Sequence, residues 1–232
     1  HCLPMFYMAG ILNTFFSSIF SQNKIILSER FSVFNIGNIS PLIKKNKVNS
    51  LHMTPDIYLG IYKTLDSKEL NSTLKNVTNL ISTGSILHNE IKDNYFKKFR
   101  KKIFSCYGLT ELGGPLTIEN DKTYKTKNCV GIHDKKLKIK VIKQKIYINS
   151  PFKTKGYISS SGLQKLKLEK NFYDTGDLGF YKNKKLFING RAKDIIKKGG
   201  EIVSLSLVEN IFLSRDDILE VAAVPINQDL TI

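Results

Sequence analysis

Asp177 and Arg191 are the residues whose types and spacing point most directly to chemistry. Asp177 stands between two glycines in the segment Tyr173–Gly179, and Arg191 follows in Gly190–Lys197. Glycines permit backbone conformations that other residues resist, so we expect a tight turn that presents the Asp177 carboxylate. A carboxylate accepts hydrogen bonds from two vicinal hydroxyls, and a guanidinium pairs with phosphate. The two residues therefore predict a binding site for the ribose and phosphate of a nucleotide.

A second candidate cluster lies upstream, in the run Tyr107, Gly108, Leu109, Thr110 and Glu111. It follows a predicted strand, and parallel sheets bind ligands at the carboxyl ends of their strands. The ring of Tyr107 can stack on adenine, the Thr110 hydroxyl can bond a phosphate oxygen, and Glu111 can hold Mg²⁺ against the phosphates. Taken alone, the run also fits an ordinary turn with an exposed glutamate.

Two glycine-containing loops complete the candidate set. Gly84 and Ser85 follow a predicted strand, where they form either an adenine-side loop or an ordinary strand-to-helix connection. Gly199 and Gly200 form either a hairpin turn or a place where the backbone approaches a ligand closely, such as a pantetheine arm.

The elements that must position these residues differ along the chain. Upstream of residue 130 we expect strands at Lys24–Leu27, Val48–Met53, Val77–Ser82 and Ile103–Cys106. We expect helices at Met8–Phe20, Ile36–Lys45, Asp56–Leu65 and His88–Phe99. Alternation of this kind predicts an α/β fold, with a mostly parallel sheet flanked by helices.

Downstream of residue 130 the pattern becomes that of a small antiparallel β unit. We expect strands at Leu137–Ile142, Lys145–Asn149, Gly179–Tyr181 and Lys185–Ile188. Beyond Gly190 we expect a strand at Asp194–Ile196, a helix at Ser204–Leu213 and a strand at Leu219–Val224. We therefore divide the chain into residues 1–130, the α/β part of a large N-terminal domain, residues 131–189, a β subdomain, and residues 190–232, the start of a mobile α+β C-terminal domain.

The composition is that of a globular protein with a strong basic excess. The 232 residues include 41% hydrophobic and 24% charged residues, and the formal net charge is +16. Only four of the 36 basic residues are arginines, the residue that nucleic-acid readers favour. We therefore expect solvated lysine faces and no nucleic-acid partner, although a basic nucleic-acid-binding module stays an alternative.

The cysteines, the histidines and the apolar run near residue 10 bear on compartment, metal binding and membrane insertion. The three cysteines are scattered, which favours a reduced, cytoplasmic compartment. The four histidines lack the spacing of a metal site. The apolar run Met5–Phe20 is interrupted by polar residues and is too short to span a membrane.

In their order along the chain, these motifs resemble those of the adenylate-forming (AMP-binding) superfamily. The run from Tyr107, the segment Tyr173–Gly179 and the sequence from Gly190 to Glu201 carry the resemblance, which covers almost the whole chain. The last of these motifs is most similar to that of acyl-CoA synthetases. The resemblance implies ATP, Mg²⁺ and coenzyme A as ligands and a small carboxylic acid as substrate.

The resemblance also implies roles for single residues. Tyr107 would stack on adenine, Thr110 would contact the α-phosphate and Glu111 would bind Mg²⁺. Asp177 would take the ribose hydroxyls, and Arg191 would contact ribose or phosphate.

A second group of implied roles concerns the C-terminal part. Lys193 would be the hinge about which the C-terminal domain turns between two reaction states. Lys197, Gly199 and Gly200 would approach the adenylate or coenzyme A in the second state. By composition alone, Lys193 and Lys197 also fit a solvated face.

The chain departs from the family pattern at several points. Tyr7 stands where many members have histidine, and Ile86 replaces a frequent proline. The upstream phosphate loop and the C-terminal catalytic lysine are absent, so we expect a piece of a longer protein that is inactive by itself. The acceptor can be coenzyme A or a carrier-protein phosphopantetheine, and a non-catalytic nucleotide- or partner-binding module is a further alternative.

Overall fold

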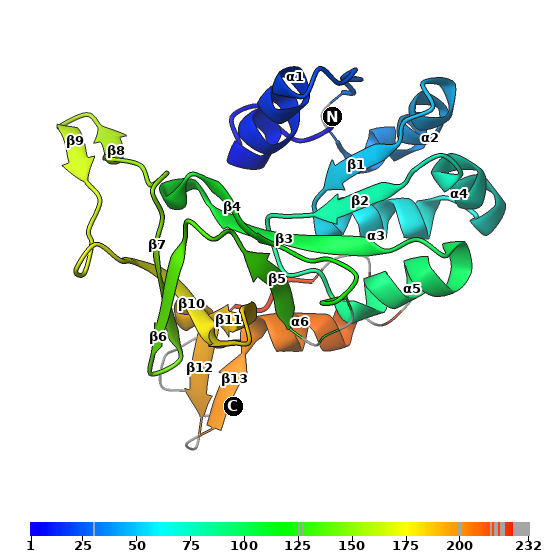
Figure 1. Ribbon diagram of the computed structural model, residues 1–232. Helices are drawn as coiled ribbons and strands as arrows, with labels where there is room; N and C mark the ends of the chain where they lie inside the picture. Colours follow the sequence, from blue (N-terminus) through cyan, green and yellow to red (C-terminus); the bar gives the residue numbers. More distant parts are fainter. Residues whose placement is uncertain are drawn as a thin grey trace.

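The computed structural model describes residues 1–29, 31–124, 126, 128–198, 201–213, 215, 218 and 221–224. Its centre is a mixed sheet of nine strands in the order β1-β2-β3-β4-β5-β11-β10-β7-β6 (Figure 1). The strands β1, β2 and β3 run parallel, and the remaining neighbours run antiparallel. The α/β fold with a helix-flanked parallel part is therefore confirmed, and the antiparallel part continues the same sheet.

The strand bounds show how the sheet is built along the chain. The strands of the large sheet are β1 (Ser50–Met53), β2 (Asn79–Ser82), β3 (Ile103–Leu109), β4 (Gly114–Ile118), β5 (Cys129–His133), β6 (Lys138–Ile142), β7 (Lys145–Asn149), β10 (Tyr173–Lys182) and β11 (Lys185–Arg191). Two separate hairpins pair β8 (Gly156–Ser159) with β9 (Gly162–Lys165) and β12 (Ile195–Lys198) with β13 (Glu201–Ser204).

Helices gather around the parallel half of the sheet in Figure 1. The chain opens with a π-helical segment, η1, that continues into α1. The helical elements are η1 (Ala9–Phe16), α1 (Ser17–Phe20), η2 (Val33–Asn35), α2 (Ile36–Lys45), α3 (Pro55–Thr64), α4 (Ser67–Leu74), α5 (Asn89–Phe99), η3 (Thr110–Leu112), η4 (Ala192–Asp194) and α6 (Leu205–Leu213).

Local signals explain where several helices begin and end. Pro55 occupies the start of α3, where its missing N–H costs nothing. The Asp66 carboxylate caps α4 by accepting from the backbone N–H of Glu69 at 2.8 Å. Arg100 adopts a left-handed conformation that ends α5.

Two tyrosines fasten the helices to the parallel strands. The buried Tyr58 hydroxyl of α3 lies 3.1 Å from the carbonyl oxygen of Leu51 in β1 and 3.0 Å from that of Ile81 in β2. The Tyr95 hydroxyl of α5 donates to the Tyr58 carbonyl at 2.8 Å, and the two rings meet edge to face at 5.7 Å. Each buried hydroxyl thus has a partner, as a dry core requires.

A buried ion pair joins α5 to the segment after β4. Lys92 Nζ lies 2.6 Å from Glu119 Oε2, and the side chains are 4% and 0% exposed. The same oxygen accepts from the Ser105 backbone N–H at 2.7 Å. These contacts tie the helical layer to the start of the antiparallel half.

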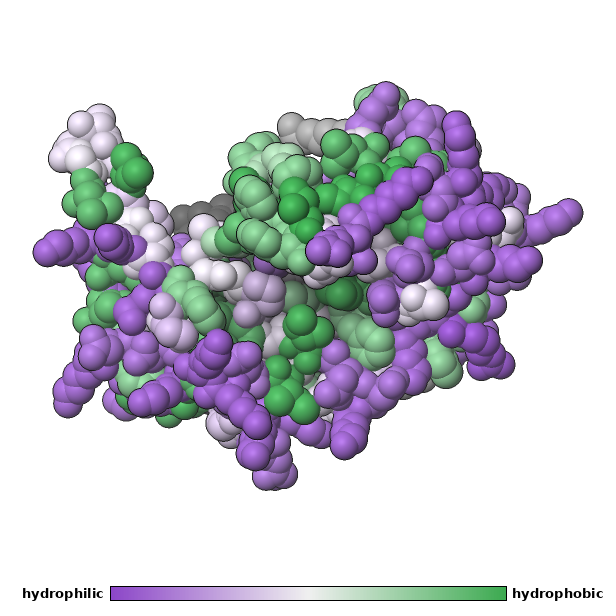
Figure 2. All heavy atoms as spheres, turned by 45° about the horizontal axis from the view of Figure 1, so that its top comes forward, coloured by the Kyte–Doolittle hydropathy of each residue, from purple (hydrophilic) through white to green (hydrophobic). Residues whose placement is uncertain are grey.

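Hydrophilic and apolar side chains occupy different parts of the surface in Figure 2. Hydrophilic side chains spread around the rim of this view. An apolar area lies over η1 and α1, whose exposed members include Leu12, Phe16, Ile19 and Phe20.

The structure corrects several predicted elements. Residues 24–27 form no strand, because this apolar run pairs with no sheet edge. Gly179–Tyr181 is only part of the longer β10, and α4, β4, β5, β8, β9 and β13 were not predicted. Of the predicted strand Leu219–Val224, the described residues 221–224 lie outside helix and strand. The division into three domains stays a prediction.

Candidate active site

Asp177 lies on a bulged strand, so the predicted tight turn is wrong. In β10, Asp177 pairs with Arg191 of β11 on one side. On the other side the register to β7 shifts between Asp174 and Leu178, and Gly176 has a φ of +72°. The glycine serves a β-bulge, which re-aims side chains within a paired strand.

The Asp177 carboxylate joins its own strand to Arg191 on the neighbouring strand β11 and to the distant Tyr107 on β3. Its Oδ2 accepts from the Tyr107 hydroxyl at 2.7 Å, and its Oδ1 accepts from Arg191 Nε at 3.1 Å. The Asp177 side chain is 4% exposed, whereas that of Arg191 is 50% exposed. The predicted proximity of Asp177 and Arg191 is therefore present in the structure.

Burial dominates the electrostatics of this cluster. It raises the pKa of Asp177 above its usual range, although the Tyr107 hydrogen bond and the Arg191 charge oppose the shift. Burial, with Asp177 beside it, also raises the pKa of Tyr107 well above its usual range, so this hydroxyl stays protonated and donates. The carboxylate is thus held dry and oriented by two donors.

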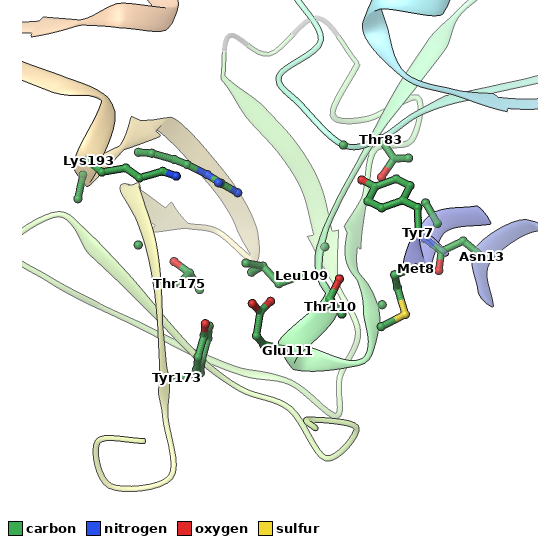
Figure 3. Close-up of a pocket in the computed structure, with 17 residues that line it drawn as sticks. Tyr7, Met8, Asn13, Thr83, Leu109, Thr110, Glu111, Tyr173, Thr175 and Lys193 are labelled. Carbon is green, nitrogen blue, oxygen red and sulfur yellow. The ribbon is translucent and has the colours of Figure 1, made fainter. Parts of the chain in front are cut away.

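A cavity of about 500 Å³ opens beside this cluster, within the range of small-molecule sites. Figure 3 shows Tyr7, Met8 and Asn13 on one side, Tyr173, Thr175 and Lys193 on the other, and Thr110 and Glu111 between them. The cavity therefore collects residues from η1, β10 and η4 around the end of β3.

The cavity brings together part of the predicted site. The predicted residues that line it are Gly84, Gly108, Thr110, Glu111, Arg191 and Lys193. Ser85, Tyr107 and Asp177 do not line it, and Asp177 reaches it only through Arg191. Lys197 lies in β12, its side chain outside the described part, and Gly199 and Gly200 lie outside the described residues.

Glu111 stands where the cavity meets the β8–β9 hairpin. Its Oε1 accepts from the Tyr157 hydroxyl at 2.8 Å, and Tyr157 lies 3.3 Å from the Tyr173 hydroxyl, oxygen to oxygen. These neighbours raise the pKa of Tyr157 above its usual range. We predicted no role for Tyr157 or Tyr173 from their types or spacing.

Gly84 and Tyr7 lie next to each other in the cavity wall. A Cβ at Gly84 would lie 3.0 Å from the Tyr7 hydroxyl oxygen, and the φ of Gly84 is +98°. Both the space and the backbone conformation therefore favour glycine at this position. Tyr7 was noticed in the sequence only as a departure from the family pattern, and the structure places it on the cavity.

Some classes of site are not seen in the described part of the chain. No group of three or more His, Cys, Asp or Glu side chains there is arranged to hold a metal ion. Within the same residues, no helix has the length and apolar character needed to cross a membrane.

Comparison with known proteins agrees with this fold. Solved structures with the same fold are adenylate-forming enzymes, including ATP-bound MatB from Rhodopseudomonas palustris, with a TM-score of 0.75 and 20% identity over 90% of this chain and 43% of that one. An anthranilate CoA ligase, AuaEII, in complex with anthranoyl-AMP has a TM-score of 0.78 and 16% identity over 93% of this chain and 43% of that one. The model of the AMP-binding enzyme family matches residues 1–164, and the chain belongs to this family.

Curated relatives point to the same group of ligases. The chain is 24% identical to 4-coumarate–CoA ligase 3 of Arabidopsis thaliana, covering 98% of this chain and 43% of the relative. It is 25% identical to a putative acyl-coenzyme A synthetase of Emericella nidulans, covering 96% of this chain and 41% of the relative. The chain thus spans less than half the length of these two relatives.

Proposed function

We propose that the protein activates a small carboxylic acid with ATP as an acyl-adenylate and then forms a thioester with coenzyme A. The observation that carries the proposal is the single cavity lined by Gly84, Thr110, Glu111, Arg191 and Lys193, with Asp177 behind it. Family membership and the CoA-ligase relatives support the same chemistry.

In the first step a carboxylate oxygen of the acid attacks the α-phosphorus of ATP. The bond to the β-phosphate breaks and pyrophosphate leaves. Thr110 would hydrogen-bond the α-phosphate and Arg191 would offset its charge, while Asp177, buried behind the cavity wall, would orient Arg191. Catalysis of this kind rests on positioning and charge stabilisation.

In the second step the coenzyme A thiolate attacks the acyl carbon, and AMP leaves. Lys193 lies in η4, directly between the large sheet and the β12–β13 hairpin, which suits the proposed hinge. Lys197, Gly199 and Gly200 would then approach the adenylate or coenzyme A.

Glu111 is the residue that would hold Mg²⁺. It lines the cavity, and its carboxylate accepts from the Tyr157 hydroxyl through Oε1, which leaves Oε2 for a cation. Mg²⁺ commonly takes one or two protein carboxylates and fills its other positions with phosphate oxygens and water. When bound, the ion would supply charge stabilisation at the phosphates.

The test is binding of an acyl-sulfamoyl-adenosine, a stable mimic of the acyl-adenylate, to the 232-residue chain by calorimetry. We expect binding that AMP competes away and that Thr110→Val weakens, because its hydroxyl contacts the phosphate position. Thr64→Val is the matched control, since Thr64 is exposed at the end of α3 and does not line the cavity. Absence of binding to the folded chain, or equal binding by Thr110→Val, would contradict the proposal.

The acceptor is tested separately. In a longer chain that includes the phosphate loop and the C-terminal lysine, thioester formation is compared with coenzyme A and with a carrier-protein phosphopantetheine. We expect coenzyme A to be used, and product with the carrier protein alone would assign the acceptor to the alternative.

A further inference from the structure

A second, smaller cavity adjoins the first one. Its volume is about 300 Å³, and its wall is largely apolar, with Ile81, Cys106 and Pro115 among its members. Asn13 lines both cavities, so the two meet at this residue. A cavity of 150 Å³ holds a benzene ring, so this compartment has room for a ring or a short chain with a substituent.

Two polar atoms in this compartment lack partners. Asn13 Oδ1 and His52 Nε2 are both buried, and neither has a hydrogen-bond partner among the described residues. A third polar group of the wall, the Ser17 hydroxyl, does have a partner. It donates to the backbone carbonyl oxygen of Asn13 at 2.6 Å. Buried polar atoms without partners destabilise a fold, and such atoms in a cavity are commonly satisfied by a ligand or by water.

The two unpartnered atoms have different hydrogen-bonding abilities. Asn13 Oδ1 only accepts hydrogen bonds. Burial lowers the pKa of His52 to about 4, so its ring is neutral near pH 7 and Nε2 donates or accepts according to its tautomer. A hydroxyl group donates one hydrogen bond and accepts others, so it complements this pair, whereas a hydrocarbon leaves both atoms unpaired.

We propose that the second cavity holds the body of the carboxylic acid and that this acid carries a hydroxyl group bound by Asn13 and His52. The inference rests on the proposed function, which places the adenylate in the adjoining cavity. Asn13 lies at the junction beside Gly114, which lines the first cavity. The two residues thus determine specificity, and a plain saturated fatty acid is disfavoured.

The experiment compares matched pairs of acyl-sulfamoyl-adenosines that differ only in one hydroxyl. The pairs carry hexanoyl against 6-hydroxyhexanoyl, and 3-phenylpropanoyl against 3-(4-hydroxyphenyl)propanoyl. Calorimetry on the 232-residue chain gives each affinity, and AMP is measured alongside. We expect the hydroxylated member of at least one pair to bind about tenfold more tightly or better, because a site built to bond a hydroxyl rejects the analogue that lacks it.

Variants assign the preference to the two side chains. Asn13→Leu and His52→Phe replace each polar group by an apolar one of similar size, so we expect each to lower the hydroxyl preference about tenfold. AMP affinity should stay unchanged in His52→Phe, because His52 lines only the second cavity. Ser17→Ala is the matched control, because its hydroxyl lines the same cavity but already has a partner. This variant should keep the full preference.

The outcomes separate this inference from the proposed function. If AMP and all adenylate mimics fail to bind, the proposed function fails. If AMP binds and wild-type protein shows no hydroxyl preference in either pair, the specificity inference is wrong while the proposed function stands. A preference that survives in both Asn13→Leu and His52→Phe also overturns it.

Discussion

Replacing Asp177 by asparagine separates ligand binding from stability at this site. The carboxylate accepts from Tyr107 at 2.7 Å and from Arg191 at 3.1 Å, so it holds the Arg191 guanidinium at the cavity wall, where we propose that it meets the nucleotide. Asparagine keeps one acceptor oxygen and turns a donor toward either Tyr107 or Arg191. Hydrogen bonds to charged groups contribute about 1.5–3 kcal/mol, so AMP affinity should fall by about 10- to 100-fold.

The stability of the same variant should fall by less than the loss of a buried hydrogen bond alone would cost. Burial raises the pKa of Asp177, so the folded chain binds a proton there more readily than the unfolded chain. The free energy of unfolding of the wild-type chain therefore falls as pH rises through this raised pKa and the carboxyl ionises. Asparagine carries no charge, so the variant avoids that loss. The half-exposed Arg191 partner offsets about 0–1 kcal/mol of this at most.

Calorimetry with AMP and urea unfolding at pH 7 measure the two effects. Asp174→Asn is the control, because Asp174 lies on the same strand and accepts from the Gly176 backbone N–H, which asparagine can also do. We expect this control to change AMP affinity by less than about twofold. If Asp177→Asn binds AMP as wild type does, or if it weakens binding only by unfolding the chain, our reasoning about this carboxylate is refuted.

Three further predictions concern the fold around the site. Lys92→Met leaves the buried Glu119 carboxylate without its cation, so urea unfolding should show a loss of about 3–5 kcal/mol. Gly131→Ala should destabilise the chain by more than about 1 kcal/mol, since its Cβ would lie 2.2 Å from the backbone of the neighbouring strand at a φ of +107°. The matched control is Gly37→Ala on α2, where a Cβ meets open space, and it should stabilise the chain by about 0.5–1 kcal/mol. His52 has a folded pKa of about 4 against an ordinary 6.5, so its contribution to the free energy of unfolding is complete above pH 6.5 and is lost as pH falls toward 4. Replacing it in His52→Phe should therefore flatten the pH dependence of stability in this window by on the order of 3 kcal/mol.

Controls keep these three predictions distinct. Lys102→Met removes a partner from an exposed pair with Asp121 at 2.6 Å and should cost only about 0–1 kcal/mol, so equal losses in both lysine variants would contradict the buried-pair argument. A stable Gly131→Ala would show that the strands can separate there. An unchanged pH profile in His52→Phe would assign the acid sensitivity to other groups, such as His88, whose pKa burial also lowers.

The sequence predicted best those elements whose own pattern decides their structure. The helix Ile36–Lys45 was predicted with its observed bounds, and β1, β2 and β3 were placed within a few residues. The polar helix α4 was missed, because its residues Ser67–Leu74 carry few apolar positions and Asp66 was not considered as a cap. Local signals thus sufficed where apolar periodicity was strong.

Long-range pairing explains the errors near the site. The glycines around Asp177 suggested a turn, but β7 and β11 pair on both sides of this segment and make it a bulged strand. Thr110 and Glu111, proposed as site residues from their types and order, do line the cavity. Asn13 and His52 could not be proposed in this way, because a cavity that leaves their polar atoms unpartnered exists only after the chain has folded.

The Tyr107–Asp177 hydrogen bond spans 70 positions in the sequence, and this separation has a consequence for folding. Contacts between distant residues form slowly, because the loop between them must first be closed. During synthesis, the helical half with β1–β3 leaves the ribosome well before Arg191 does. The proposed nucleotide pocket is therefore among the last parts to assemble, and AMP, if it binds there as we propose, would report on completion of the whole sheet.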